Sequence, residues 1–131
     1  MSEQADPLQA LVVDTRQVNR DALAGILKGR VVLDLELETV NIVREARDPI
    51  SARHAVLLAL LGRKAMSLLK SEVVDAISPK ELEEITGVKG NTIRPIVRRL
   101  ADEGLIVRRP KGYTVHNAAL HLVASALTHT E

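Results

Sequence analysis

The sequence predicts a mainly α-helical fold with a small amount of β-structure, in the α+β class. The chain has 131 residues, long enough to bury a core of its own, and Tyr113 is its single aromatic residue. Phenylalanine, tryptophan and cysteine are absent, so the core must be built from aliphatic side chains and two methionines. Such a core suits packed helices better than an aromatic-rich β-sandwich.

The first 49 residues are expected to form an N-terminal extension, made of a helix followed by a β-hairpin. Apolar residues repeat at helical spacing over residues 15–28, and Gly29 ends the pattern. Over residues 30–43 apolar and polar residues alternate, with a turn at Glu38-Thr39, which indicates two short strands.

A long helix is predicted over residues 52–69, with Ser51 as its N-cap. Its first half is apolar on nearly every side, so we expect it to lie at the centre of the fold. The longest apolar run, residues 55–61, is too short to cross a membrane. Residues 117–127 are expected to form a last amphipathic helix, and we place the C-terminal segment, 117–131, among the surfaces available for dimerisation.

Two further helices are predicted between residues 78 and 104. Ser78 and Glu81 form a capping box with Pro79 at the first helical position, and Gly87 is placed to end this short helix.

The second of these helices is expected to begin after a cap at Asn91 or Thr92 and to end near Glu103, with Gly104 as its terminator. Pro95 favours the cap at Thr92, because proline is tolerated in a first turn and not in a helix interior. Two helices joined by a tight turn that contains glycine form a helix-turn-helix.

A β-hairpin is predicted next, with strands over residues 105–109 and 113–116 and a turn at residues 110–112. Four stretches then carry a resemblance: residues 78–82, residues 85–88, Thr92-Ile93-Arg94-Pro95, and residues 99–106. With them the chain resembles the winged helix-turn-helix superfamily of bacterial and archaeal DNA-binding proteins, over about half of its length, within a domain spanning residues 50–116.

The resemblance implies double-stranded DNA as the partner, with residues 92–103 as the recognition helix in the major groove and residues 105–116 as a wing on the DNA backbone. Arginine and asparagine pair with guanine and adenine edges, and basic wing residues suit phosphates. The implied DNA-binding residues are Lys89, Asn91, Thr92, Arg94, Arg98, Arg99, Arg108, Arg109 and Lys111.

The charge distribution points the same way. The net charge of the chain is only +1, yet residues 86–116 hold seven basic and two acidic side chains, whereas residues 1–49 hold six basic and nine acidic ones. A cluster of positive charge on one part of a chain is typical of a nucleic-acid contact. The alternative is a solvated helix face, on which the arginines pair with Asp102 or Glu103.

Other functions find little support in the sequence. No catalytic triad, phosphate-binding glycine loop or metal-ligand spacing occurs, so we expect no enzyme, no cofactor and no metal. Asp34, Glu36 and Glu38 alternate in the manner of a solvent-facing strand, and Tyr113 is expected to pack inward rather than to stack on bases. The absence of a secretory signal favours a cytoplasmic protein.

The leading hypothesis is therefore a DNA-binding transcriptional regulator that acts as a homodimer, because one recognition helix and one wing contact few phosphates. The stripe of residues 117–127 and the N-terminal helix and hairpin are the expected dimer surfaces. One alternative is a winged helix used as a protein-interaction module of a larger assembly, with a protein partner on the acidic N-terminal segment. A third possibility, compatible with the first, is a small-molecule sensor with a ligand pocket between the N-terminal element and the winged helix.

Overall fold

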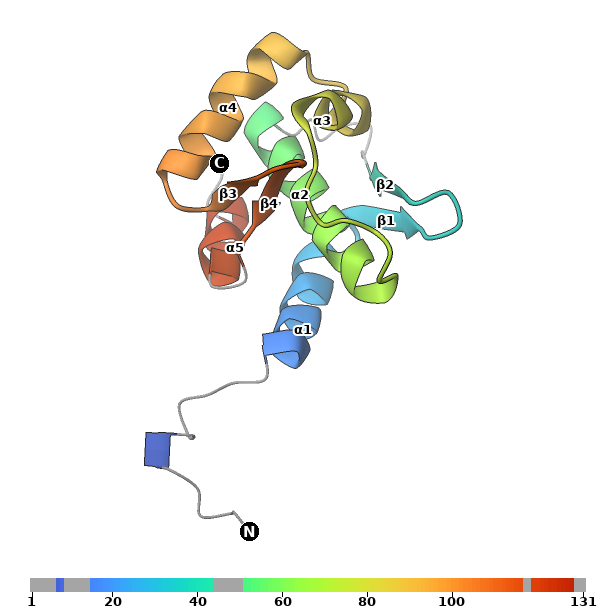
Figure 1. Ribbon diagram of the computed structural model, residues 1–131, viewed down its shortest axis with the longest axis vertical. Coiled ribbons are helices and arrows are strands. Elements are labelled where there is room, and N and C mark those ends of the chain that lie inside the picture. The colour runs from blue at the N-terminus through green and yellow to red at the C-terminus, as the bar shows by residue number, and fades with distance from the viewer. Residues whose placement is uncertain (1–6, 9–14, 44–50, 117–118, 129–131) are drawn as a thin grey trace.

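The structure is a computed structural model that describes residues 7–8, 15–43, 51–116 and 119–128. Within these residues the fold is α+β, with five helices and two antiparallel hairpins, which confirms the predicted class. In chain order the elements are α1 (Thr15–Leu27), β1 (Val31–Asp34), β2 (Thr39–Ile42), α2 (Ala52–Leu69), α3 (Pro79–Thr86), α4 (Gly90–Asp102), β3 (Ile106–Arg109), β4 (Gly112–Val115) and α5 (Leu120–Thr128) (Figure 1).

Helix α2 is the centre of the molecule, as the sequence predicts. Residues 55–62 are buried without interruption, and α2 contacts α1, β1, β2, α3, α4, β4 and α5. Its N-cap is also confirmed, because the Ser51 hydroxyl accepts a hydrogen bond from the amide of His54 at 3.1 Å. Figure 1 shows this helix passing through the middle of the fold.

One hydrophobic core joins the five helices and the two hairpins of the described chain. Leu23 from α1 packs into the same cluster as the buried residues of α2, α3, α4 and the second hairpin. The stripe predicted on the last helix, which includes Leu120, Val123 and Leu127, is buried in this cluster as well. That stripe is therefore already covered within the chain. Residues 117–118 lie outside the described part.

The first hairpin turns earlier than the alternation of its residues predicts. Strands β1 and β2 pair from Val31 with Ile42 to Asp34 with Thr39, so the turn comprises residues 35–38 rather than Glu38-Thr39. The prediction of a continuous acidic strand edge was therefore wrong, and among its three carboxylates only Asp34 lies in a strand.

Local and long-range contacts together explain this turn. The carboxylate of Asp34 accepts the amide of Leu37 at 3.0 Å, and Glu38 adopts a positive φ of 57°. From the end of α2, Lys70 donates to the carbonyl of Leu35 at 2.9 Å and pairs with the carboxylate of Glu38 at 2.8 Å. The hydrogen bond to Glu38 raises the pKa of the Lys70 ammonium above its ordinary value.

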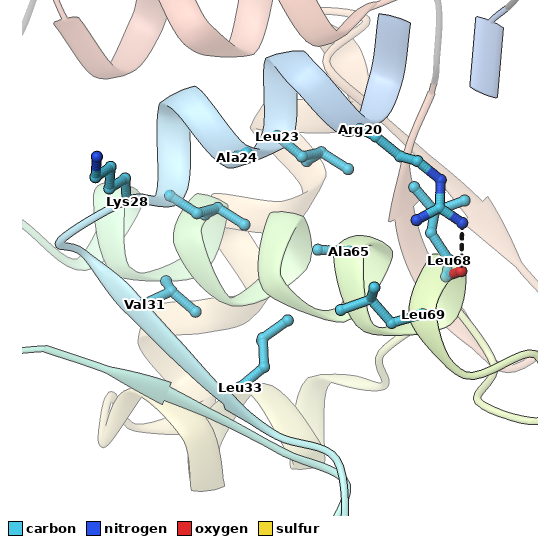
Figure 2. Close-up of a pocket in the computed structure, with 10 residues that line it drawn as sticks. Arg20, Leu23, Ala24, Lys28, Val31, Leu33, Ala65, Leu68 and Leu69 are labelled. Carbon is cyan, nitrogen blue, oxygen red and sulfur yellow. Dashed lines mark hydrogen bonds between the residues drawn. The ribbon is translucent and has the colours of Figure 1, made fainter. Parts of the chain in front are cut away.

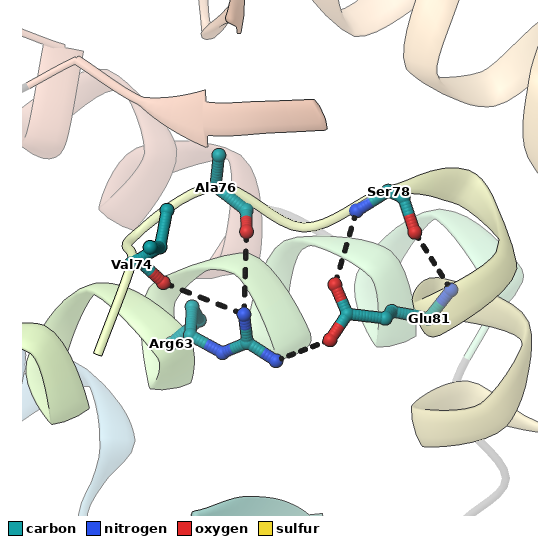
Figure 3. A network of polar contacts seen from close by, with 5 residues as sticks. All are labelled: Arg63, Val74, Ala76, Ser78 and Glu81. Atoms are coloured by element: carbon teal, nitrogen blue, oxygen red, sulfur yellow. Dashed lines mark hydrogen bonds and ion pairs between the residues drawn. The ribbon is translucent and has the colours of Figure 1, made fainter. Parts of the chain in front are cut away.

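A polar network fixes the start of α3 against α2 (Figure 3). Arg63 of α2 donates to the carbonyl of Ala76 at 3.2 Å and to the carboxylate of Glu81 at 3.0 Å. Glu81 also accepts the amide of Ser78, and the Ser78 hydroxyl accepts the amide of Glu81 at 3.2 Å. The predicted capping box is thus confirmed. Its glutamate has a second partner that sets the position of α3.

No helix in the described ranges is long and apolar enough to cross a membrane.

Candidate nucleic-acid interface

Helices α3 and α4 are joined by a tight turn that contains glycine, as the sequence predicts, and the turn comprises the three residues 87–89. Gly87 has a left-handed φ of 75°, and its amide donates to the carbonyl of Glu83 at 2.8 Å. Thr86 is buried, and its hydroxyl donates to the carbonyl of Leu82 and accepts the amide of Val88 at 3.1 Å. These bonds satisfy backbone groups at the helix end that would otherwise lack partners.

The N-terminus of α4 differs from the prediction. The helix begins at Gly90, and its N-cap is Lys89, with an extended backbone and no capping side chain. The carbonyl of Lys89 accepts the amides of Thr92 and Ile93 at 2.9 and 3.0 Å. The expected cap at Asn91 or Thr92 was therefore wrong.

Pro95 is consequently an interior residue of α4 rather than a first-turn residue. It supplies no amide hydrogen to the carbonyl of Asn91, one turn before it. Both residues are exposed, so water can hydrate that carbonyl. The proline is tolerated for this reason, and the rule that proline stays in a first turn misplaced the start of the helix.

The two faces of α4 are sharply different. Ile93, Val97 and Leu100 are buried in the core, as predicted for the inner face. The outer face carries Pro95 and a set of exposed polar and charged side chains, which are Asn91, Thr92, Arg94, Arg98, Arg99 and Asp102. An exposed helix face of this composition is available to an external partner.

The second hairpin is anchored by a glycine against the segment before α3. Ile77 forms a two-way backbone pair with Tyr113, with N to O distances of 2.9 and 2.8 Å. Gly112 has a φ of 142°, and a Cβ there would overlap the Ile77 carbonyl and lie 2.6 Å from the amide nitrogen of Ser78. Tyr113 is partly buried against the core, which confirms its predicted packing role.

All nine predicted DNA-binding residues are exposed. Six belong to α4 or its cap, and the hairpin carries Arg108, Arg109 and Lys111. Because successive strand residues point to opposite faces, Arg108 and Arg109 project in opposite directions. Lys111, in the turn, borders a cavity that is also lined by Glu72 and Glu81. The six residues of α4 and its cap therefore follow one helix, whereas the three residues of the hairpin do not share one face.

Arg94, Arg98 and Arg99 of α4 form no ion pair with any other residue that the structure describes. Glu103 pairs instead with Arg53 of α2, at 2.5 Å. That hydrogen-bonded pair holds the pKa of the Glu103 carboxyl below its ordinary value, with a smaller contribution from the charge of Arg99.

Two residues of this surface escaped the sequence analysis. Arg53 lies 50 positions from Glu103, so no local spacing reveals their pairing. Glu83 is exposed on α3, and its carboxylate occupies the space beside Gly90 that a Cβ would fill, close to Arg94. A negative charge therefore lies at the N-terminal end of α4. The glycine that leaves room for it is the signal that was overlooked.

No group of three or more potential metal ligands occurs within the residues that the structure describes. Searches for a matching protein-family model, curated protein or solved structure find no significant match to the chain.

Proposed function

We propose that this chain is a winged-helix protein that binds double-stranded DNA and acts as a transcriptional regulator in homodimeric form. Helix α4 would be the recognition helix in the major groove, and the β3–β4 hairpin the wing on the DNA backbone. The observation that carries the proposal is the outer face of α4, which presents three exposed arginines that form no ion pair with another described residue.

The order of elements supports the proposal. Two helices joined by a three-residue turn are followed directly by a two-stranded hairpin, and Ile77 forms an isolated β-bridge with Tyr113. The buried inner face of α4 holds the helix on α2 and α3, so its outer face is presented on a rigid support. Contacts from a rigid element cost less ordering entropy on binding than contacts from a mobile one.

Pairing of Arg53 with Glu103 favours DNA contact over the solvated-face alternative. A helix stabilised only by its own ion pairs would place its acidic residues opposite its arginines at helical spacing. Here Glu103 pairs with Arg53 of α2, and Asp102, although it lies at helical spacing from Arg98 and Arg99, forms an ion pair with neither. The positive charge of α4 therefore stays available to phosphate oxygens.

The dimer surface is assigned to the first hairpin rather than to α5. The apolar stripe of α5 is buried in the core, whereas Val32, Leu35 and Leu37 of the hairpin segment are 56, 38 and 72% exposed. Exposed apolar side chains gathered on one element mark an interaction surface. In light scattering we expect a dimer that Leu37→Glu and Val32→Glu dissociate, and a wild-type monomer at high concentration would refute the dimer.

The test of DNA binding is a titration of labelled duplex at several salt concentrations. We expect affinity to fall steeply with salt, and the double variant Arg94→Ala, Arg98→Ala to reduce the slope of log K against log salt by up to about 2. Arg30→Ala is the matched control, because Arg30 is exposed and its side chain donates to the carbonyl of Ile26 on α1. Absence of binding to any duplex at low salt would refute the proposal.

A substitution of Glu83 should change the DNA affinity in the opposite direction in the same titration. Its carboxylate lies beside Gly90, where it competes with a phosphate for the positive end of the helix dipole. Glu83→Gln should therefore strengthen DNA binding several-fold at low salt. Glu84→Gln, which alters the neighbouring exposed carboxylate on the same helix, is the control. A weaker Glu83→Gln complex would mean that this end of α4 does not approach the DNA backbone.

The exposed hairpin also favours a second candidate, a winged helix that serves as a protein-interaction module. In that case the apolar side chains of the hairpin would dock another protein rather than a second copy. A monomeric protein that binds no duplex would favour this candidate over the first.

A further inference from the structure

A cavity of about 290 Å³ lies between α1, β1 and the second half of α2. Its walls are aliphatic and come from all three elements: Leu23, Leu27, Val31, Leu33, Ala65 and Leu69. Figure 2 shows these walls facing one another across the space, with Arg20 at the end nearest Leu68 and Leu69. Leu69 is 56% exposed, so this end of the cavity is open to solvent.

The charges that line the cavity are all positive. Arg20 and Lys28 line it, and no carboxylate of the described residues does. Arg20 lies on α1 and Lys28 directly follows its last residue, eight positions later, or ~12 Å along the helix axis. An aliphatic cavity with a cation at each end is complementary to a slender molecule that is apolar along its length and anionic at its end.

The guanidinium of Arg20 is held in place at the open end. One of its Nη atoms donates to the carbonyl of Leu68 at 2.8 Å, close to the end of α2 (Figure 2). A guanidinium has five N–H donors, and no described carboxylate pairs with Arg20. An arginine oriented by a backbone hydrogen bond, with further N–H donors that no described carboxylate engages, is well suited to bind a carboxylate in a bidentate manner.

We propose that this cavity binds an unbranched aliphatic carboxylate of medium chain length, with the carboxylate on Arg20 and the alkyl chain along Leu23, Val31 and Leu33. Sugars and nucleotides do not fit, because the wall offers no set of polar groups to replace their hydration. The ligand site lies apart from the outer face of α4, so ligand binding and DNA binding succeed or fail separately.

The test is calorimetric titration of the full chain with butanoate, hexanoate, octanoate and decanoate, below their micelle concentrations and without DNA. Affinity should rise about fourfold per added methylene until the cavity is filled, and then level off. Octan-1-ol should bind more weakly than octanoate. Absence of saturable binding by all four acids, or affinity that does not depend on chain length, would overturn the proposal.

Variants distinguish this site from adventitious binding. Arg20→Gln should remove the preference for octanoate over octan-1-ol, whereas Arg30→Gln, exposed and outside the cavity, should retain it. Ala65→Leu should fill the cavity and abolish binding. In amide chemical-shift mapping of the unaltered protein, octanoate should perturb Ala24 and Ala65 more than Ala101, and the reverse would overturn the assignment of the site whether or not Ala65→Leu folds.

Discussion

Substitution of Gly112 by alanine should cost far more stability than a surface substitution usually does. Gly112 lies at the start of β4 with a φ of 142°, a conformation that L-residues other than glycine rarely adopt. A Cβ added there would overlap the carbonyl of Ile77 and lie 2.6 Å from the amide nitrogen of Ser78. Both of these groups belong to the backbone, so neither can move aside as a flexible side chain would.

The magnitude follows from what must be broken. Relief of the overlap requires Ile77 and Tyr113 to separate, which removes two backbone hydrogen bonds of 2.9 and 2.8 Å. At about 1 kcal/mol each, these bonds contribute about 2 kcal/mol. Strained backbone at a non-glycine residue adds about 1 to 3 kcal/mol. We therefore expect Gly112→Ala to lower the free energy of unfolding by about 3 to 5 kcal/mol, a large part of a typical domain stability.

Urea denaturation followed by circular dichroism measures this loss, and Gly25→Ala is the matched control. Gly25 lies within α1, is exposed, and has no atom within 4 Å of an added Cβ. The same change there should stabilise the protein by about 0.5 to 1 kcal/mol, because alanine favours helices. Equal effects at both positions, or a loss below about 1 kcal/mol at Gly112, would refute the reasoning from backbone overlap.

Three further predictions concern polar groups. Ser78→Ala should lower the free energy of unfolding in urea by about 1 kcal/mol, because it removes one half of the capping box. Arg63→Met should cost about 2 to 3 kcal/mol in the same assay, because the Arg63 side chain is only 12% exposed and its loss removes the hydrogen bonds to the Ala76 carbonyl and to one oxygen of the Glu81 carboxylate. Arg53→Met, at 36% exposure, should cost less than about 1 kcal/mol, and equal losses would contradict this ranking. The pKa of Glu103 is depressed in the folded state, so its contribution to stability is present above the unfolded-state pKa and is lost as pH falls through the folded-state pKa. Titration of its carboxyl carbon by NMR should show the pKa rising in Arg53→Met, and an unchanged value would contradict the pairing.

The parts of the fold that the sequence predicted well are those specified by local signals. The capping box at Ser78 and the terminator Gly87 depend on neighbouring residues, and both occur where they were expected. The burial of α2 follows from apolar residues on nearly every side of one segment. The amphipathic pattern of α4 likewise predicted which side chains are exposed, and these include the candidate DNA-binding residues.

The parts that were mispredicted depend on contacts between distant segments or on solvent. The turn of the first hairpin is positioned by Lys70, 32 residues beyond Glu38, and no local rule reveals this contact. The start of α4 was misplaced because an exposed Pro95 costs less than a buried one, and exposure is a property of the folded chain. The cavity beside α1 was not assigned from the sequence, because its walls come from three separate elements.

The central position of α2 means that the described chain is one cooperative unit. The helix packs against the N-terminal elements, the helices of the proposed DNA-binding domain and α5 at once. Removal of the first 43 residues would expose the side of α2 that Leu23 and Val40 now cover. We expect a single unfolding transition for the intact protein, since a shared core cannot melt in parts. We expect a fragment limited to residues 50–116 to aggregate, because the apolar side of α2 would be uncovered. Helix α2 therefore contacts both α1, which borders the proposed ligand site, and α4, which carries the proposed DNA-binding face.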